Sequence, residues 1–369
     1  MTDALFSTDR LDRARAAAAA AGLDALIVTP SADLRYLTGY QAHPLERLTC
    51  LLLPVDGDPV LISPQLEVPA AHASPAGKLG IEIAGWQETQ NAYAFAAARL
   101  PKGVGVVGVD NHMWAEKLVG FREVMPGVRQ ELAGTVLSDL RMRKTPAEVE
   151  ALRRAGDAID RVHARMGEWL RAGRTERQVG KDIADAILAE GHESVDFVIV
   201  ASGPNGASPH AEVSERVIER GEPVVVDIGG TMPSGYCSDS TRNYCVGQAP
   251  ADYLRAFGVL LAAQTAQCES IRPGITAERL DAVGREIITE AGYGEQFIHR
   301  TGHGIGLETH EEPYIVSGSA RPLEPGMAFS VEPGIYLPGL HGARIEDIAV
   351  CTETGGERLN LTSRELRLL

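Results

Sequence analysis

The first third of the chain alternates between helical and strand-like patterns of apolar residues. Helices are predicted over residues 8–21, 88–99 and 114–121, and apolar strands over residues 24–28, 48–54, 59–63 and 104–110. An Asp-Gly pair at 56–57 separates the second and third strands and predicts that they are neighbours joined by a turn. Strands that alternate with helices predict a small α/β domain over residues 1–138.

A strong helix start follows this region and marks the predicted domain boundary. Thr145 has the character of an N-cap, Pro146 takes the first helical position, and Glu148 completes a capping box. A second helix is predicted to start at Thr175. Two further helices are predicted over residues 250–271 and 276–291, and strands over residues 195–201, 223–229, 235–246, 328–336 and 343–352. Clustered strands with segregated helices predict an α+β domain over residues 139–369.

Length and composition exclude several classes of protein. A chain of 369 residues is too long for one ordinary core and suits two domains. The net charge of −15 argues against nucleic acid or an anionic membrane as a partner, and no segment approaches the apolar length that spans a bilayer. Five scattered cysteines without a CxxC pair argue against a disulfide framework, so a cytoplasmic location is expected.

Four acidic residues lie inside or beside predicted strands, where an unpaired carboxylate is costly to desolvate. They are Asp227 in VVVD, Asp239 in YCSDSTR, Glu332 in FSVEPG and Glu346 in ARIEDIAV. The two aspartates are twelve residues apart and the two glutamates fourteen, and turn-rich segments join each pair. A β-hairpin in each case would return the second acid to the side of the first.

A histidine framed by glycines completes the pattern. His303 lies in TGHGIG, and Gly302 and Gly304 would let its backbone approach bound ions closely. Four converging carboxylates repel one another unless a cation is bound, and with one imidazole they suit two divalent ions. Each residue alone is more often a helix cap or an ion-pair partner, so the combination carries the interpretation. A phosphate loop is disfavoured because no Lys-Ser/Thr pair follows the glycines.

The ordered motifs VVVDIGG, GYCSDSTR, HRTGHGIGLETHEEP, LEPGMAFSVEPGIY and GARIEDIAV resemble the pita-bread metallopeptidases. With the N-terminal α/β domain and KTPAEVEALRRA, the chain is similar to the Xaa-Pro peptidase and creatinase branch, which includes prolidase (Xaa-Pro dipeptidase) and aminopeptidase P. The resemblance implies a creatinase-like α/β N-terminal domain and an α+β pita-bread catalytic domain. Methionine aminopeptidases typically lack the large N-terminal domain, so that activity is disfavoured.

The resemblance also implies roles for individual residues. The metal ligands of the family match Asp227, Asp239, His303, Glu332 and Glu346, with Asp239 and Glu346 at the bridging positions. Carboxylate-rich ligation favours two Mn²⁺ ions, with Co²⁺ or Zn²⁺ as alternatives. The catalytic candidates are Glu332, which would move a proton toward the leaving nitrogen, His310, which would donate to the developing oxyanion, and His210, which borders the substrate. Substrate-binding candidates are His299, Arg344, Tyr336 and Arg47.

Two departures from the family pattern stand out. The aspartates are twelve residues apart, where eleven is usual in many members, and one extra residue in the turn is easily absorbed. Some prolidases have an arginine shortly after the second histidine that holds the dipeptide's carboxylate, and here Tyr314 follows HEEP. Arg47 is a candidate for that role, reaching the site of a neighbouring subunit. A solvated cation on an edge strand is at least as good an interpretation of Arg47.

The favoured function is metal-dependent hydrolysis of the bond between an N-terminal residue and proline in a dipeptide. An aminopeptidase P acting on longer Xaa-Pro peptides is the main alternative. An inactive binding scaffold and a metal-free creatinase-like hydrolase are disfavoured, because all five ligand positions are filled. Short proline-containing peptides are the expected substrates, and a homodimer is expected because such relatives are often dimers.

Overall fold

The computed structural model describes residues 5–369, in which two units follow one another along the chain and divide after Arg141. The division falls within a helix that begins at Gly134, slightly beyond the predicted boundary after residue 138. Among residues 5–369, no helix combines the length and apolar character needed to cross a bilayer.

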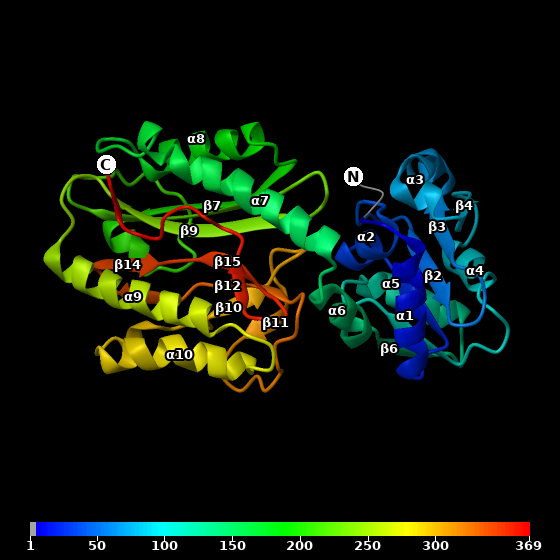
Figure 1. Ribbon diagram of the computed structural model, residues 1–369. Coiled ribbons are helices and arrows are strands. Elements are labelled where there is room, and N and C mark those ends of the chain that lie inside the picture. Colours follow the sequence, from blue (N-terminus) through cyan, green and yellow to red (C-terminus); the bar gives the residue numbers. More distant parts are fainter. Residues whose placement is uncertain (1–4) are drawn as a thin grey trace. The chain divides into compact units, whose positions relative to one another are not determined.

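The first unit is built on a six-stranded mixed sheet in the order β4-β3-β2-β1-β5-β6 (Figure 1). Its strands are β1 Ala25–Val28, β2 Cys50–Pro54, β3 Val60–Pro64, β4 Glu82–Trp86, β5 Val106–Val109 and β6 Arg129–Leu132. Its helices are α1 Thr8–Ala20, α2 Ala32–Thr38, α3 Val68–Ala73, α4 Ala92–Ala97, α5 Ala115–Val124 and α6 Gly134–Met142, with 3₁₀ turns η2 Gln65–Glu67 and η3 Pro75–Lys78. The antiparallel pairing of β2 with β3 confirms the predicted Asp-Gly connection.

The sequence pattern missed several elements of this unit. Strand β6 is polar and largely exposed, so it lacks the alternation that identifies a strand. Helix α4 is shorter than predicted, because the side chain of Asn91 accepts from the Ala94 N–H and caps the helix start there. Helices α2, α3 and α6 and strand β4 were also not predicted, since short elements carry too few turns to show a period.

The second unit contains the predicted capping box at Thr145 and another at the predicted helix start Thr175. Its helices are α7 Pro146–Ala164, α8 Glu176–Ala189, α9 Ala251–Ser270 and α10 Ala277–Glu290, with 3₁₀ turns η4 Met166–Glu168, η5 Gly203–Ala207 and η6 Gly294–Gln296. At the start of α7 the Thr145 hydroxyl accepts from the Glu148 N–H, and the Glu148 carboxylate accepts from the Thr145 N–H. Thr175 and Gln178 do the same at α8. Two of the four orphan N–H groups are thus satisfied at each helix start.

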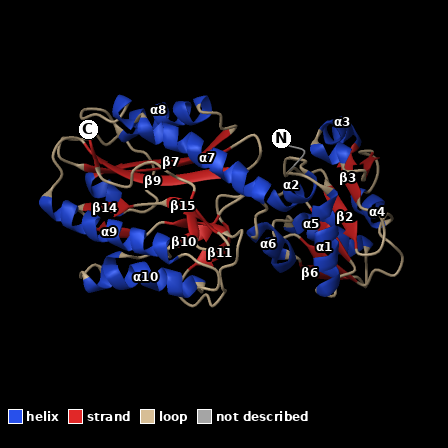
Figure 2. Cartoon of the chain, in the orientation of Figure 1, coloured by secondary structure: helices blue, strands red, loops and turns tan. Residues whose placement is uncertain are grey.

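Three sheets form the centre of the second unit. One has the order β17-β9-β8-β7, with β7 Ser194–Ser202, β8 Pro223–Thr231, β9 Cys237–Cys245 and β17 Arg367–Leu368. Another has the order β11-β10-β12-β15-β16, with β10 Gly302–Gly304, β11 Glu311–Ile315, β12 Ala328–Val331, β15 Asp347–Cys351 and β16 Gly356–Arg358. The third pairs β13 Gly334–Leu337 with β14 His341–Arg344. Figure 2 shows α7 and α8 on one side of these strands and α9 and α10 on the other.

The predicted strands 328–336 and 343–352 each break into two. Residues 328–336 divide at Pro333 into β12 and β13, because proline has no N–H to continue a strand ladder. Residues 343–352 divide into β14 and β15. The simple hairpin predicted between Glu332 and Glu346 is therefore wrong in detail: β12 pairs with β15, and a separate hairpin of β13 and β14 lies between them.

Candidate metal centre and active site

The hairpin of β8 and β9 brings the two aspartates together as predicted. Asp227 lies opposite Thr241, and Asp239 lies opposite Gly229. Because the two pairs are two residues apart along each strand, both aspartates project from the same face of the sheet. Both side chains are buried, and one carboxylate oxygen of each lies within 4.8 Å of the other.

The two glutamates come from the ends of paired strands. Val331 is paired with Asp347, so Glu332 directly follows β12 where Glu346 directly precedes β15. The Thr241 hydroxyl on β9 donates to the Glu346 carboxylate over 2.7 Å. This hydrogen bond links the glutamate pair to the hairpin that carries the aspartates.

His303 is the central residue of β10 and faces these acids. Its Nε2 lies 3.0 Å from Glu332 Oε1 and 3.7 Å from Asp239 Oδ2. A Cβ at Gly302 would lie 1.9 Å from the Ser330 carbonyl oxygen, and one at Gly304 would lie 2.2 Å from the Glu312 carbonyl oxygen. The predicted reason for these glycines is therefore corrected. They make room for the backbones of neighbouring strands, which fixes the position of His303.

The donor atoms form three overlapping groups, each confined within 4.8 Å. The groups are Asp227–Asp239–Glu346, His303–Glu332–Glu346 and Asp239–His303–His310. Burial, followed by the charges of neighbouring acids, raises the pKa of Asp239 and of Glu346 well above the ordinary range. Asp227 Oδ1 is buried and has no hydrogen-bond partner. Carboxylate oxygens around one imidazole, one of them without a hydrogen-bond partner, are the donor set that borderline divalent cations take, so these residues fit the implied metals.

Arg344, a predicted substrate-binding residue, is buried among the acids. Its guanidinium forms an ion pair with Asp227, donates to Tyr336 Oη over 2.9 Å, and lies 4.0 Å from Glu332. The charges of Tyr336 and Asp227 outweigh burial and raise the pKa of Arg344 well above its ordinary value. The guanidinium of Arg344 therefore contacts side chains of the site itself. His299 extends this arrangement, since its Nε2 lies 2.9 Å from Tyr336 Oη.

His310 and His210 both line the same cavity as the acids. The ring of His310 lies 3.9 Å from that of His303, measured between centroids. Burial, and then the neighbouring His303, lower the pKa of His310 to about 4. His310 is thus a neutral imidazole at neutral pH, with one N–H to donate.

The cavity has a volume of about 1110 Å³, and the residues that line it all lie between Asp196 and Glu346 in the chain. The predicted residues on its wall are Asp227, Asp239, His303, Glu332, Glu346, His310, His210, His299 and Arg344. Sequence reasoning missed other wall residues, namely Asp196, Phe197, Ile199, Ser208, Pro209, Ile298, Arg300, Glu308 and Thr309. Ile199 and Phe197 had a usable signal, because they are two residues apart in a predicted strand and so share a face; in the structure Ile199 is paired with Asp227.

Arg47 is engaged elsewhere. Its Nε lies 2.7 Å from Glu88 Oε1, and its Nη1 lies 3.0 Å from Glu46 Oε1. These three side chains belong to the first unit, whereas the described lining of the cavity comes from the second. This placement fits the interpretation of Arg47 as a solvated cation. A role in a neighbouring subunit stays a prediction.

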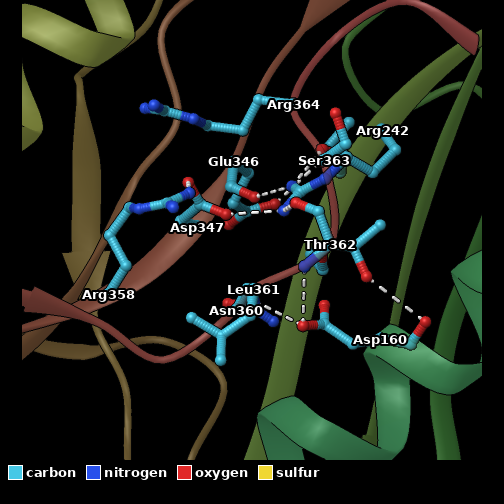
Figure 3. A network of polar contacts seen from close by, with 12 residues as sticks. Asp160, Arg242, Glu346, Asp347, Arg358, Asn360, Leu361, Thr362, Ser363 and Arg364 are labelled. Atoms are coloured by element: carbon cyan, nitrogen blue, oxygen red, sulfur yellow. Dashed lines mark hydrogen bonds and ion pairs between the residues drawn. The ribbon is translucent and has the colours of Figure 1, made fainter.

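A second set of charges lies directly behind Glu346 (Figure 3). Asp347, the next residue, accepts from Arg242 over 2.6 Å, from Arg358 over 2.9 Å and from Gln264 over 3.0 Å. Arg242 also donates to the backbone carbonyls of Glu346 and Thr362. Although burial alone would raise it, the charges of Arg242 and Arg358 lower the pKa of Asp347.

Fold and site together define a class of protein: the chain belongs to metallopeptidase family M24. The model of that family matches residues 150–353, and the model of the creatinase/prolidase N-terminal domain matches residues 10–143. Both the resemblance and the fold class, an α/β creatinase-like domain followed by an α+β pita-bread domain, are confirmed.

Individual relatives show which members of the family the chain is similar to. The chain is 50% identical over 364 residues to the probable dipeptidase PepE of Mycobacterium tuberculosis, covering 99% of this chain and 97% of that protein. It is 36% identical to the Xaa-Pro dipeptidase of Lactobacillus helveticus, covering 94% and 95% of the two chains. The crystal structure of dipeptidase PepE from Mycobacterium ulcerans superposes with a TM-score of 0.92 at 48% identity, covering 98% of this chain and 97% of that chain.

Proposed function

We propose that this chain is a dinuclear metal-dependent Xaa-Pro dipeptidase. The observation that carries the proposal is the convergence of four carboxylates and His303 on one cavity, with an orphaned oxygen on Asp227 and two acids of raised pKa. Relatives named as dipeptidases over almost the full length support the substrate class. We also propose that the catalytic domain spans residues 139–369.

The donor groups divide into two sets that share Glu346. Asp227, Asp239 and Glu346 would hold one ion, and His303, Glu332 and Glu346 would hold the other. Asp239 also belongs to the group that contains His303, which fits a bridging position for it. When bound, the ions supply Lewis-acid polarisation of a carbonyl oxygen and acidify water. Mn²⁺ is favoured by the carboxylate-rich donor set, with Co²⁺ and Zn²⁺ as alternatives.

Glu332, itself a donor, and the side chains around the donors supply the proton transfer and the substrate contacts. The leaving nitrogen of a peptide bond needs a proton as the bond breaks, and in an Xaa-Pro bond that nitrogen carries no hydrogen beforehand. Glu332 accepts a proton from water and returns it to that nitrogen. His310, neutral at working pH, donates its N–H to the oxyanion that develops on the carbonyl. His210 lies on the wall beside the substrate.

The test compares a matched pair of peptides. Protein stripped with EDTA and reloaded with Mn²⁺ is given Ala-Pro and Ala-Pro-Ala, with Ala-Ala as the control for proline selectivity, and its metal content is measured separately. Cleavage of Ala-Pro alone is expected. Cleavage of the tripeptide would make the chain an aminopeptidase P. Bound metal without cleavage of either peptide would contradict Xaa-Pro specificity, and failure to bind metal would contradict the site.

Two further expectations accompany the proposal. A cytoplasmic homodimer is proposed from the likeness to this branch of the family. Light scattering on the purified protein tests the dimer, and fractionation of cells that produce the protein tests its location.

A further inference from the structure

The loop that carries His210 has little apolar anchoring of its own. It runs over residues 203–222, between β7 and β8, and its first turn is η5. All of these residues are described, and among them the only fully buried apolar side chain is that of Ile218. His210, with Ser208 and Pro209, nevertheless lines the cavity. A surface segment with few buried apolar contacts needs polar contacts to hold one conformation.

A single buried carboxylate, that of Glu176, supplies several of these polar contacts. Glu176 is the first residue of α8, follows the N-cap Thr175, and has an exposed fraction of 0%. Its Oε1 accepts from the Ser202 N–H and from Ser202 Oγ, each over 2.7 Å. Both of its oxygens accept from Asn205 Nδ2, over 3.1 and 3.0 Å, and Oε2 also accepts from Ser214 Oγ. Every partner is a donor, which suits an ionised carboxylate.

These partners lie on both sides of His210 in the chain. Ser202 and Asn205 precede the histidine, and Ser214 follows it. One carboxylate therefore ties together the two ends of the segment 206–213, which has His210 near its middle. Compact surface loops whose ends are held close together in this way keep a defined shape.

The start of α8 also holds the far end of the loop through its main chain. The Glu176 N–H donates to the Arg216 carbonyl, and the Arg177 N–H donates to the Ser214 carbonyl. Neither N–H has a partner inside the helix, so the loop satisfies two groups that every helix start leaves open. Arg216 Nη1 in turn donates to Ser202 Oγ over 2.7 Å, which places a cation beside the hydroxyl that Glu176 binds.

The near end of the loop packs against β14. A Cβ on Gly206 would lie 3.3 Å from Gly342 N, and a Cβ on Gly342 would lie 2.0 Å from the Gly206 carbonyl oxygen. Gly342 precedes Arg344 by two residues on β14, and Arg344 lines the cavity. The turn before His210 is therefore fixed against a strand that carries part of the cavity wall.

We propose that Glu176 is a positioning residue for His210: its carboxylate fixes the segment 206–213 and thereby keeps the imidazole on the cavity wall beside the substrate. The inference rests on the proposed dipeptidase function. Glu176 is not among the described residues that line the cavity, so it acts through the loop and touches no reacting atom. A misplacement of about 1 Å in a group that contacts the substrate can lower a rate by up to roughly 100-fold.

The first experiment changes the carboxylate to an amide of the same size. Glu176→Gln places an NH₂ group among donors that need an acceptor, so we expect kcat/KM of the Mn²⁺-loaded protein on Ala-Pro to fall roughly 10-fold. The loss should divide between kcat and KM in the same ratio as in His210→Ala, and the bound Mn²⁺ should be unchanged. The matched control is Glu278→Gln, an exposed glutamate in the first turn of α10, which should stay within about twofold of the wild type.

A double-variant cycle separates this role from a general structural one. If Glu176 acts through His210, its effect disappears once the histidine is gone. The protein with both Glu176→Gln and His210→Ala should therefore have the same kcat/KM as His210→Ala alone, within about twofold. Ser214→Ala removes the partner on the far side of His210, and it should give a smaller loss with the same division between kcat and KM. It carries the same test if Glu176→Gln does not fold.

Hydrogen exchange, read by mass spectrometry, reports on the loop without turnover. Within the segment 206–213, the N–H groups of Ser208 and Ala211 donate to carbonyls of the loop itself. Glu176→Gln should speed exchange in this segment by roughly 10-fold, because its ends are no longer held together, and leave α9 and α10 unchanged.

Three outcomes would overturn the inference. The first is a double variant that shows the product of the two single losses, and the second is unchanged exchange in the segment 206–213 of Glu176→Gln. The third is a loss of activity that follows an equal loss of bound Mn²⁺. If the wild type binds Mn²⁺ but cleaves neither Ala-Pro nor Ala-Pro-Ala, the proposed function fails by itself. The exchange measurement then still decides whether Glu176 fixes the loop.

Discussion

Glu346 and Asp347 are consecutive residues that point to opposite sides of the chain and meet opposite surroundings. Asp347 is surrounded by donors from Arg242, Arg358 and Gln264, and its pKa is lowered (Figure 3). Glu346 faces other acids, accepts a hydrogen bond from the Thr241 hydroxyl, and has a raised pKa. Both carboxylates are buried to the same degree, so burial does not explain the difference.

The difference shows how a buried acid reveals its role. A carboxylate whose charge is compensated by fixed arginines stabilises the fold and has no capacity left for a ligand. A buried carboxylate without a compensating group raises the free energy of the metal-free protein. Such a carboxylate is retained where a bound cation offsets that cost. The two residues therefore separate a structural charge network from the candidate metal centre, and the substitutions Glu346→Gln and Asp347→Asn test that separation.

The largest effect is expected from Glu346→Gln. Glu346 belongs to two of the three donor groups, so its loss should weaken both proposed ion positions. We expect kcat/KM with Mn²⁺ to fall on the order of 10³-fold or more. Because the neutral amide removes an uncompensated charge, the metal-free variant should unfold at a urea concentration no lower than that of the wild type. Undiminished Mn²⁺ binding in calorimetry would contradict the assignment of Glu346 as a ligand.

Asp347→Asn is expected to lower the free energy of unfolding and not to act through metal binding. It leaves the buried guanidinium of Arg242 without its carboxylate, which is expected to cost about 3–5 kcal/mol of unfolding free energy in urea titrations of the metal-free protein. The matched control is Arg358→Gln, which removes a partner that is 31% exposed and should cost about 1 kcal/mol. If Asp347→Asn proved no more harmful to stability than Glu346→Gln, the distinction between the two acids would be lost.

The smallest effect concerns pH. His163 on α7 is buried near Tyr244 and the Ser240 carbonyl, and burial, followed by the charge of Arg242, lowers its pKa from 6.5 to about 3. A depressed pKa gives stability that is present above the unfolded value and lost as pH falls toward the folded value. Between pH 6.5 and pH 5 this one group should cost about 2 kcal/mol.

The measurement for His163 compares metal-free wild type with His163→Gln in urea titrations across this pH range. The other titrating groups are shared by both proteins, so their contributions cancel in the difference. The free-energy gap between wild type and variant should change by the expected amount between pH 6.5 and pH 5. A gap that does not vary with pH would show that His163 titrates normally in the folded protein.

The helices and the aspartate hairpin were predictable because their signals are local. Thr145 and Glu148 are three residues apart, and both hydrogen bonds of their capping box formed as predicted. Asp227 and Asp239 lie on two adjacent strands joined by a short turn, so the period of two placed them on one face. The family motifs extended the prediction to His303 and the two glutamates, which the structure brings to the same cavity.

Other features depended on contacts between distant segments. The partners of Asp347 come from β9, α9 and β16. No local period records such neighbours. The sequence by itself determined which acids exist and that each lies within or beside a strand. The tertiary structure alone decided which acid receives the buried arginine, because Arg242, which compensates the charge of Asp347, lies 105 residues away along the chain.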